Sequence, residues 1–148
     1  MPSTYLSLHI HLVFSTKNRE HWFEKSFRTD LHAYLGGTIK GLGAQVRQVG
    51  GVSDHVHLLF DPRSTHCLSD LVRELKKNSS LWIREQLKRS AFSWQEGYGA
   101  FTVSPSQLRK VKGYIENQEA HHFQQTYREE LEGMLMKAGV KYDPAYLD

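Results

Sequence analysis

The chain has 148 residues, of which 39% are hydrophobic, and this length fits one globular domain over residues 1–148 rather than two. No apolar run approaches a membrane span, and the only cysteine, Cys67, excludes an intrachain disulfide, so a cytoplasmic protein is expected. The net charge of +3 is weak evidence for a polyanionic partner, but seven acids and only three bases lie from Glu116 onward. The excess of positive charge therefore lies before Glu116, and this is where a polyanionic partner would bind.

The first half of the chain predicts a strand, a helix and two further strands. Residues 5–14 alternate and are rich in β-branched and aromatic types, and apolar residues at helical spacing follow over residues 27–42. Two strands, over residues 44–49 and 52–60, flank Gly50-Gly51, a dipeptide that permits a tight hairpin turn.

The second half predicts a long helix, a strand and two more helices. The long helix covers residues 68–88, and a loop and last strand cover residues 92–103. Ser104, followed by proline, opens a helix that carries Tyr114 and Gln118, and the pair Thr126 and Glu129 opens a terminal helix that ends near Gly139. This order indicates an α+β fold with a ferredoxin-like (RRM-like) antiparallel sheet and helices on its faces.

Two histidines alternate with one apolar residue in the stretch GVSDHVHLLFD. On a strand, His55 and His57 point to one face, while Val56 points to the other, so two ring nitrogens converge in a way that suits a divalent cation. Surface or hydrogen-bonded histidines would show the same pattern. His9 and His11 have the same spacing, so spacing alone leaves both pairs open as the metal site.

A phenol and a third possible ligand occur together in VKGYIENQEAHHF. Tyr114 and Gln118 are four residues apart and share one face of a helix. A buried tyrosine on an amphipathic helix would look the same. His121 is seven residues from Tyr114 and competes with Gln118 as the ligand.

A stripe of polar and basic side chains follows the outer face of the helix over residues 68–88. Such a face is usually just solvated, but here lysines and arginines that can neutralise phosphates lie beside an aromatic side chain that can stack on bases. The candidate DNA-binding residues are Arg73, Lys76, Lys77, Ser80, Arg84 and Lys88.

Five segments in this order closely resemble the HUH single-tyrosine transposases of small bacterial insertion sequences, with REP-associated tyrosine transposases as close relatives. The similarity covers nearly the whole chain and rests on HLVFSTKNR, HVH, LVRELKKNSSLWI, WQEGYGAFTVS and YIENQ. The family's histidine pair corresponds to His55 and His57, its nucleophile to Tyr114 and its third metal ligand to Gln118.

The resemblance implies an enzyme that cleaves and rejoins single-stranded DNA through a 5′-phosphotyrosine, with Mg2+ or Mn2+ as cofactor. It implies binding of DNA hairpins near element ends. It also implies a homodimer in which the tyrosine helix of one subunit completes the active site of the other.

Two other functions remain as alternatives. One is a non-catalytic module that binds single-stranded nucleic acid through aromatic side chains on its sheet. The other is a domesticated relative that processes chromosomal repeat hairpins with the same chemistry. A metal-independent cyclic phosphodiesterase would need paired His-x-Thr or His-x-Ser motifs, and the segment from His55 to Leu58 does not supply them.

Overall fold

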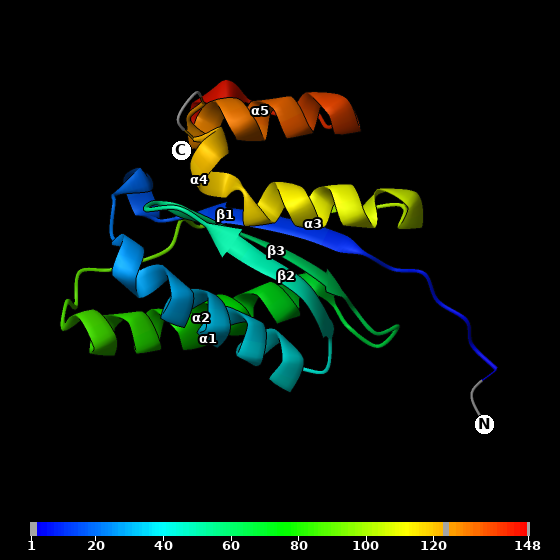
Figure 1. The fold of residues 1–148 in the computed structure, drawn as a ribbon, viewed down its shortest axis with the longest axis horizontal. Helices are drawn as coiled ribbons and strands as arrows, with labels where there is room; N and C mark the ends of the chain where they lie inside the picture. Colours follow the sequence, from blue (N-terminus) through cyan, green and yellow to red (C-terminus); the bar gives the residue numbers. More distant parts are fainter. Residues whose placement is uncertain (1–2, 123–124, 148) are drawn as a thin grey trace.

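A computed structural model describes residues 3–122 and 125–147 and contains one four-stranded antiparallel sheet (Figure 1). The strands are β1 (Ile10–Ser15), β2 (Gln45–Gly51), β3 (His55–Asp61) and β4 (Gly99–Thr102), in the spatial order β2-β3-β1-β4. The predicted α+β fold is confirmed, because this is the β-α-β-β-α-β arrangement of ferredoxin-like proteins.

Helices α1 (Lys25–Gly41) and α2 (Leu68–Leu87) cover one face of the sheet (Figure 1). Between them and the sheet lies the main core, where the apolar side chains of β3 (Val56, Leu58 and Phe60) pack against both helices. Within this core, the indole nitrogen of Trp94 finds an internal partner, because it donates to Ser79 Oγ at 2.9 Å.

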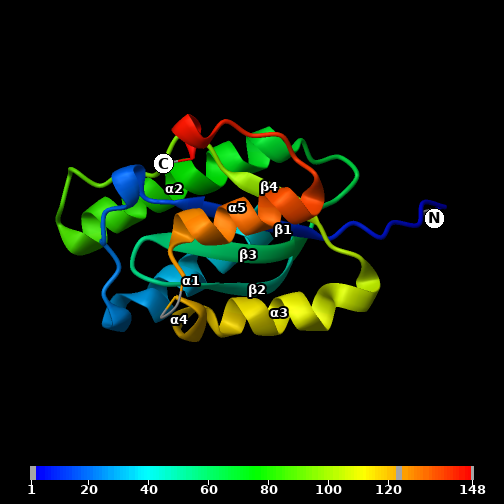
Figure 2. The same ribbon diagram turned by 90° about the horizontal axis from the view of Figure 1, so that it is seen from above.

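The other face is covered by α3 (Leu108–Glu116), α4 (Gln118–His121) and α5 (Tyr127–Ala138), as Figures 1 and 2 show. Two small apolar clusters hold this layer, one around Ile115 of α3 and one around Leu131 of α5. Polar side chains of β3 and β1 lie between these clusters. Three short 3₁₀ turns complete the described chain, at Lys17–Arg19, Pro105–Gln107 and Pro144–Tyr146.

Most predicted elements are present within a few residues of their expected bounds. The capping pair at the start of α5 is confirmed, since the Thr126 side chain accepts from the Glu129 backbone and the Glu129 side chain from the Thr126 backbone. Gly139 ends α5 in the left-handed conformation with φ of 69°. Within residues 3–122 and 125–147, no helix combines the length and apolar character needed to cross a bilayer.

Two predicted bounds are wrong for physical reasons. The first strand begins at Ile10 rather than Tyr5, because Ile10 is the first residue that pairs with both neighbouring strands, and Tyr5 is 92% exposed. The helix expected to carry both Tyr114 and Gln118 is interrupted at Asn117, whose side-chain nitrogen donates to the Gly113 carbonyl at 3.0 Å.

The prediction that Gly50-Gly51 forms a hairpin turn is also wrong. Both glycines lie within β2, and the chain reverses at residues 52–54. At Gly50 a side chain would overlap the carbonyl oxygen of Ile115 and lie 2.8 Å from its Cγ2 atom. Glycine is therefore required here because the backbone of α3 contacts β2 directly, which fixes the position of Tyr114 beside β3.

We predict that Gly50→Ala lowers the free energy of unfolding by about 1–3 kcal/mol, because the added methyl group pushes α3 away from β2. Chemical denaturation measures the change. The matched control is Gly37→Ala in α1, where an added Cβ has no neighbour within 4 Å and should stabilise the helix by about 0.5–1 kcal/mol. Equal stabilities of the two variants would contradict the close approach of α3.

Candidate active site

Helices α3, α4 and α5 lie over one face of the sheet (Figure 2), and His55 and His57 of β3 point to this face, where they contact Gln118 of α4 and Glu130 of α5. Both side chains are completely buried, and their ring centroids are 5.1 Å apart. A buried imidazole needs a partner for each ring nitrogen. The partners of these four nitrogens define the site.

His55 lies between Asp54 and the α4–α5 layer. Its Nδ1 atom lies 2.7 Å from Asp54 Oδ1, and its Nε2 atom lies 3.1 Å from Gln118 Oε1. Burial lowers the pKa of His55, but the hydrogen bonds to Asp54 and Glu130 outweigh burial and raise the pKa to about 9. Both ring nitrogens therefore donate in the metal-free protein, and a cation on Nε2 would replace one of these protons.

His57 is held in a line of three side chains. Its Nε2 atom lies 2.9 Å from Glu130 Oε1 and its Nδ1 atom lies 2.7 Å from His11 Nε2. Burial lowers the pKa of His57 to about 4 and that of His11 to about 3, so both rings are neutral. Because a carboxylate only accepts, Nε2 of His57 carries its hydrogen and Nδ1 accepts from His11.

The first histidine pair does not form a site of its own. His9 bonds to Asp61 at 2.6 Å, whereas His11 bonds to His57. The two rings thus have different partners. His11 instead orients His57, the role that outer-shell groups play for metal-binding histidines.

Tyr114 and Gln118 reach the same point from α3 and α4. The Tyr114 hydroxyl donates to Glu130 Oε2, and Gln118 Nε2 lies 3.2 Å from the same oxygen. Gln118 is only 1% exposed. Burial and the neighbouring Glu130 carboxylate raise the pKa of Tyr114, so its phenol is protonated at neutral pH.

Sequence reasoning missed Glu130, which contacts the predicted nucleophile and all three predicted metal ligands. It lies on α5, and His122 Nε2 also lies 3.2 Å from its Oε1 atom. A signal was present in the sequence, because Tyr127, Glu130 and Leu131 occupy the i, i+3 and i+4 positions of the buried face of α5. An acid in an apolar stripe is buried only when it is paired.

The donor atoms present fit a divalent cation. Among the described residues, one possible ligand atom from each of His55, His57, His122 and Glu130 lies within 4.8 Å of the other three. Imidazole nitrogen with carboxylate oxygen is a usual ligand combination for Mn2+, Zn2+ and similar ions. Whether His121 replaces Gln118 as the third metal ligand stays open, because the side chain of His121 lies outside the described part of the chain.

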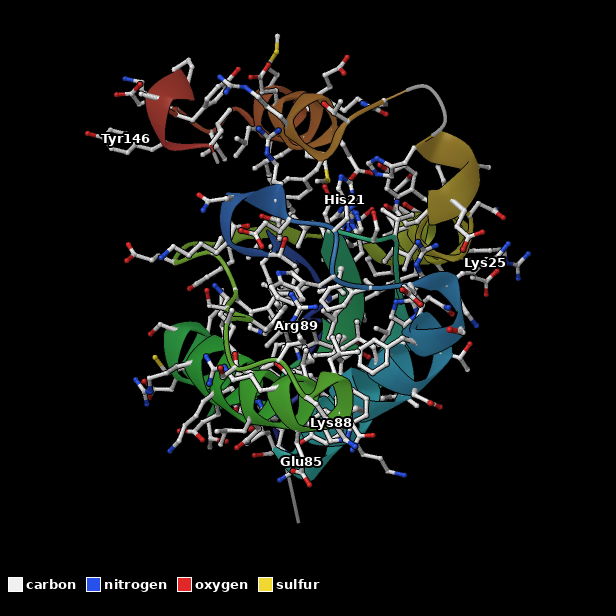
Figure 3. All side chains as sticks on the ribbon, turned by 90° about the vertical axis from the view of Figure 1, so that its left-hand side faces the viewer. His21, Lys25, Glu85, Lys88, Arg89 and Tyr146 are labelled. Atoms are coloured by element: carbon white, nitrogen blue, oxygen red, sulfur yellow. The ribbon has the colours of Figure 1, made fainter. Side chains whose placement is uncertain are left out.

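A surface pocket of about 630 Å³ reaches the edge of this site. Asp54 and His122 line it from the inside, and Asn18 and His21 line it from the loop after β1. His21 lies on the side of the molecule where α4 and α5 approach the sheet (Figure 3). The pocket thus reaches His122, whereas the buried His55, His57 and Glu130 do not line it.

The candidate DNA-binding residues of α2 lie on the other side of the sheet (Figure 1). Arg73, Lys77 and Lys88 are exposed, and Figure 3 shows Lys88 at the end of α2 remote from α5. Ser80 and Arg84 are half-buried, and Arg84 Nε donates to the Phe92 carbonyl at 2.9 Å.

Lys76, one of the candidate DNA-binding residues, contacts other parts of the chain in this structure. Its ammonium group donates to the carbonyl oxygens of Gln95, Glu96 and Gly97 at 2.8, 3.3 and 2.6 Å. It also lies 5.1 Å from the centre of the Phe14 ring. Lys76 therefore anchors the loop before β4.

Comparison with known proteins gives the family. The family model described as "Transposase IS200 like" matches residues 4–118. The transposases for insertion sequence element IS200 of Salmonella typhimurium and Salmonella typhi are each 26% identical over 114 residues, which covers 73% of this chain and 74% of the relative. The fold, the site and this match define a transposase, a class of enzyme that transfers DNA strands. The chain belongs to the family of IS200-like transposases.

Two solved structures share the fold. A protein from Deinococcus radiodurans described as a transposase has a TM-score of 0.65 at 24% identity, covering 80% of this chain and 96% of that protein. A REP-associated tyrosine transposase bound to a REP hairpin has a TM-score of 0.59 at 14% identity, covering 82% and 74%. Each of these two structures shows that the fold is shared over about four fifths of the chain.

We predict that Lys76→Met lowers the free energy of unfolding by about 1–2 kcal/mol, because three carbonyl groups lose a charged donor. Lys77→Met, the exposed neighbour, should change it by no more than about 0.5 kcal/mol. Thermal and chemical denaturation give both values. A Lys77 variant as unstable as the Lys76 variant would contradict the anchoring role.

Proposed function

We propose that this transposase cleaves and rejoins single-stranded DNA at the ends of an insertion sequence, with Tyr114 as nucleophile. One observation carries the proposal. The Tyr114 hydroxyl lies beside a buried cluster in which His55, His57 and Gln118 direct nitrogen and oxygen atoms to one point. A phenol next to a cation site is an arrangement that suits metal-assisted cleavage of a phosphodiester by tyrosine.

Each residue of the site has a separate role in the proposed reaction. His55, His57 and Gln118 would hold Mg2+ or Mn2+, and such a cation would supply charge that polarises the scissile phosphate. The Tyr114 oxygen forms a bond to phosphorus, and the bond from phosphorus to the 3′ oxygen breaks. The phenol loses its proton and the departing 3′ oxygen gains one. The 5′-phosphotyrosine conserves the energy of the broken linkage, so a second 3′ hydroxyl restores a phosphodiester without a nucleotide cofactor.

We further propose that the protein binds DNA hairpins, as the REP-associated relative in the solved complex does. The exposed bases Arg73, Lys77 and Lys88 of α2, with Ser80 and Arg84, are the proposed contacts. They lie across the sheet from Tyr114 (Figure 1). Hairpin binding and strand cleavage would therefore use different faces, in a protein that works in the cytoplasm, where its DNA is.

We propose that the active form is a homodimer. Each subunit has one nucleophilic tyrosine, which cuts one strand end, and an insertion sequence has two ends to cut. The site residues of a single chain already contact one another, through Tyr114, Glu130 and His57. Assembly of the site thus does not require exchange of the tyrosine helix between subunits. We propose that each subunit builds its complete active site from its own residues. The expectation from the resemblance, in which two subunits share each site, is the alternative.

The two alternative functions give different outcomes in the same assay. A non-catalytic single-strand-binding module would bind hairpins and form no covalent adduct under any condition. A domesticated relative would form the adduct on chromosomal repeat hairpins.

The first test concerns the nucleophile. Purified protein incubated with labelled hairpin oligonucleotides and Mn2+ should form a covalent adduct that survives a denaturing gel, and Tyr114→Phe should abolish it. Tyr98→Phe is the matched control and should leave the adduct unchanged, because Tyr98 is exposed and lies outside the histidine cluster. An adduct with the Tyr114 variant would refute the assignment.

The second test separates sites built within a subunit from shared sites. Two inactive chains are mixed, one with Tyr114→Phe and one with both His55→Ala and His57→Ala. If each subunit builds its own site, the mixture stays inactive, at less than about 1% of the wild-type cleavage rate. Exchange of the tyrosine helix would restore cleavage in mixed dimers, and hairpin binding by each chain serves as the control for folding.

A further inference from the structure

Glu130 occupies the centre of the candidate metal site, although it is not one of the proposed metal ligands. Its Oε1 atom lies 2.9 Å from His57 Nε2, 3.3 Å from His55 Nε2 and 3.2 Å from His122 Nε2. Three imidazole nitrogens from β3 and the segment after α4 thus point at one carboxylate oxygen. The side chain is 1% exposed, so water does not compensate its charge.

The position of this carboxylate is set by the fold of α5 and not by a bound ion. The capping pair at Thr126 fixes the first turn of the helix. Tyr127, Leu131 and Leu135 then pack against Val13 of β1 in one apolar cluster. Glu130 lies between these anchors and is held against the histidines by the surrounding core.

The charge of Glu130 changes which cations the site favours. His55, His57 and Gln118 are neutral ligands, and imidazoles alone suit Zn2+, Ni2+ or Cu2+ at least as well as Mg2+ or Mn2+. A carboxylate adds a hard, anionic oxygen, the donor that Mg2+ and Mn2+ prefer. Such a group strengthens a site for these ions, and among the described residues Glu130 is the acid in the cluster of possible ligands.

We infer that Glu130 is a ligand of the divalent cation and raises the affinity of the centre for Mn2+ and Mg2+ relative to its affinity for Zn2+. This inference rests on the metal centre of the proposed function. Oε1 binds the cation together with His55 and His57. Oε2 keeps its hydrogen bond from Tyr114, so one carboxylate holds the nucleophile beside the cation.

The test measures binding of Mn2+ alone to the metal-stripped full chain by isothermal titration calorimetry. Glu130→Gln keeps the shape of the side chain and removes its charge, and it should weaken Mn2+ binding at least tenfold. Zn2+ binding should weaken less, so the ratio of Mn2+ affinity to Zn2+ affinity falls. Glu132→Gln, the same change on the same helix, should alter Mn2+ affinity by less than twofold, because Glu132 pairs with Arg128 away from the cluster.

A second variant covers the case in which Glu130→Gln does not fold, as judged by thermal denaturation without metal. Glu130→Asp keeps the charge on a shorter side chain and should bind Mn2+ with intermediate affinity. Affinity equal to the wild type in every folded Glu130 variant would overturn the inference. Tighter Mn2+ binding after Glu130→Gln would also overturn it, because Glu130 would then compete with the cation for its position.

The doubly substituted His55→Ala, His57→Ala chain distinguishes the two levels of the argument. Loss of Mn2+ binding in this chain, with unchanged binding in Glu130→Gln, leaves the proposed metal centre intact and refutes only the role of Glu130. Undiminished binding in the doubly substituted chain refutes the metal centre itself, and the inference falls with it.

Discussion

The buried contact between Glu130 and the histidines of β3 is the interaction on which the second face of the sheet depends. A carboxylate removed from water is costly unless donors surround it, and here imidazole, phenol and amide groups all point to it. Burial raises the pKa of Glu130, but the neighbouring imidazole groups of His122, His55 and His57 outweigh this and hold the pKa far below its ordinary value. The ionised carboxylate therefore links α3, α4 and α5 to the sheet through polar contacts.

The two faces of the sheet have different tasks. The face under α1 and α2 carries a continuous apolar core, which includes Phe14, Leu35, Phe60 and Leu75. The face under α3 and α5 has two smaller apolar clusters with the polar site between them. Stability thus comes mostly from the first face, which leaves the second free to hold groups that chemistry requires. The same strand, β3, serves both faces because its side chains alternate.

Membership of the IS200-like family fits this division. The family match ends at residue 118, directly after the segment that contains Tyr114 and Gln118, whereas α5 lies beyond it. The carboxylate of Glu130 is therefore supplied by a part of the chain outside the family match. In this protein the terminal helix joins the tyrosine and the histidines of one chain into a single connected cluster, and it also gives the centre its negative charge.

The sequence by itself determined the order of strands and helices, the face shared by His55 and His57, and the caps of α5. These features depend on local spacing and on residues that are near each other along the chain. The tertiary structure decided which histidine pair faces the tyrosine, why Gly50 must lack a side chain, and that Lys76 binds carbonyl groups of a loop. It also brought Glu130 to His57, 73 residues away along the chain. Such contacts depend on how layers pack, and no local pattern encodes the distance between two segments that meet only when the core forms.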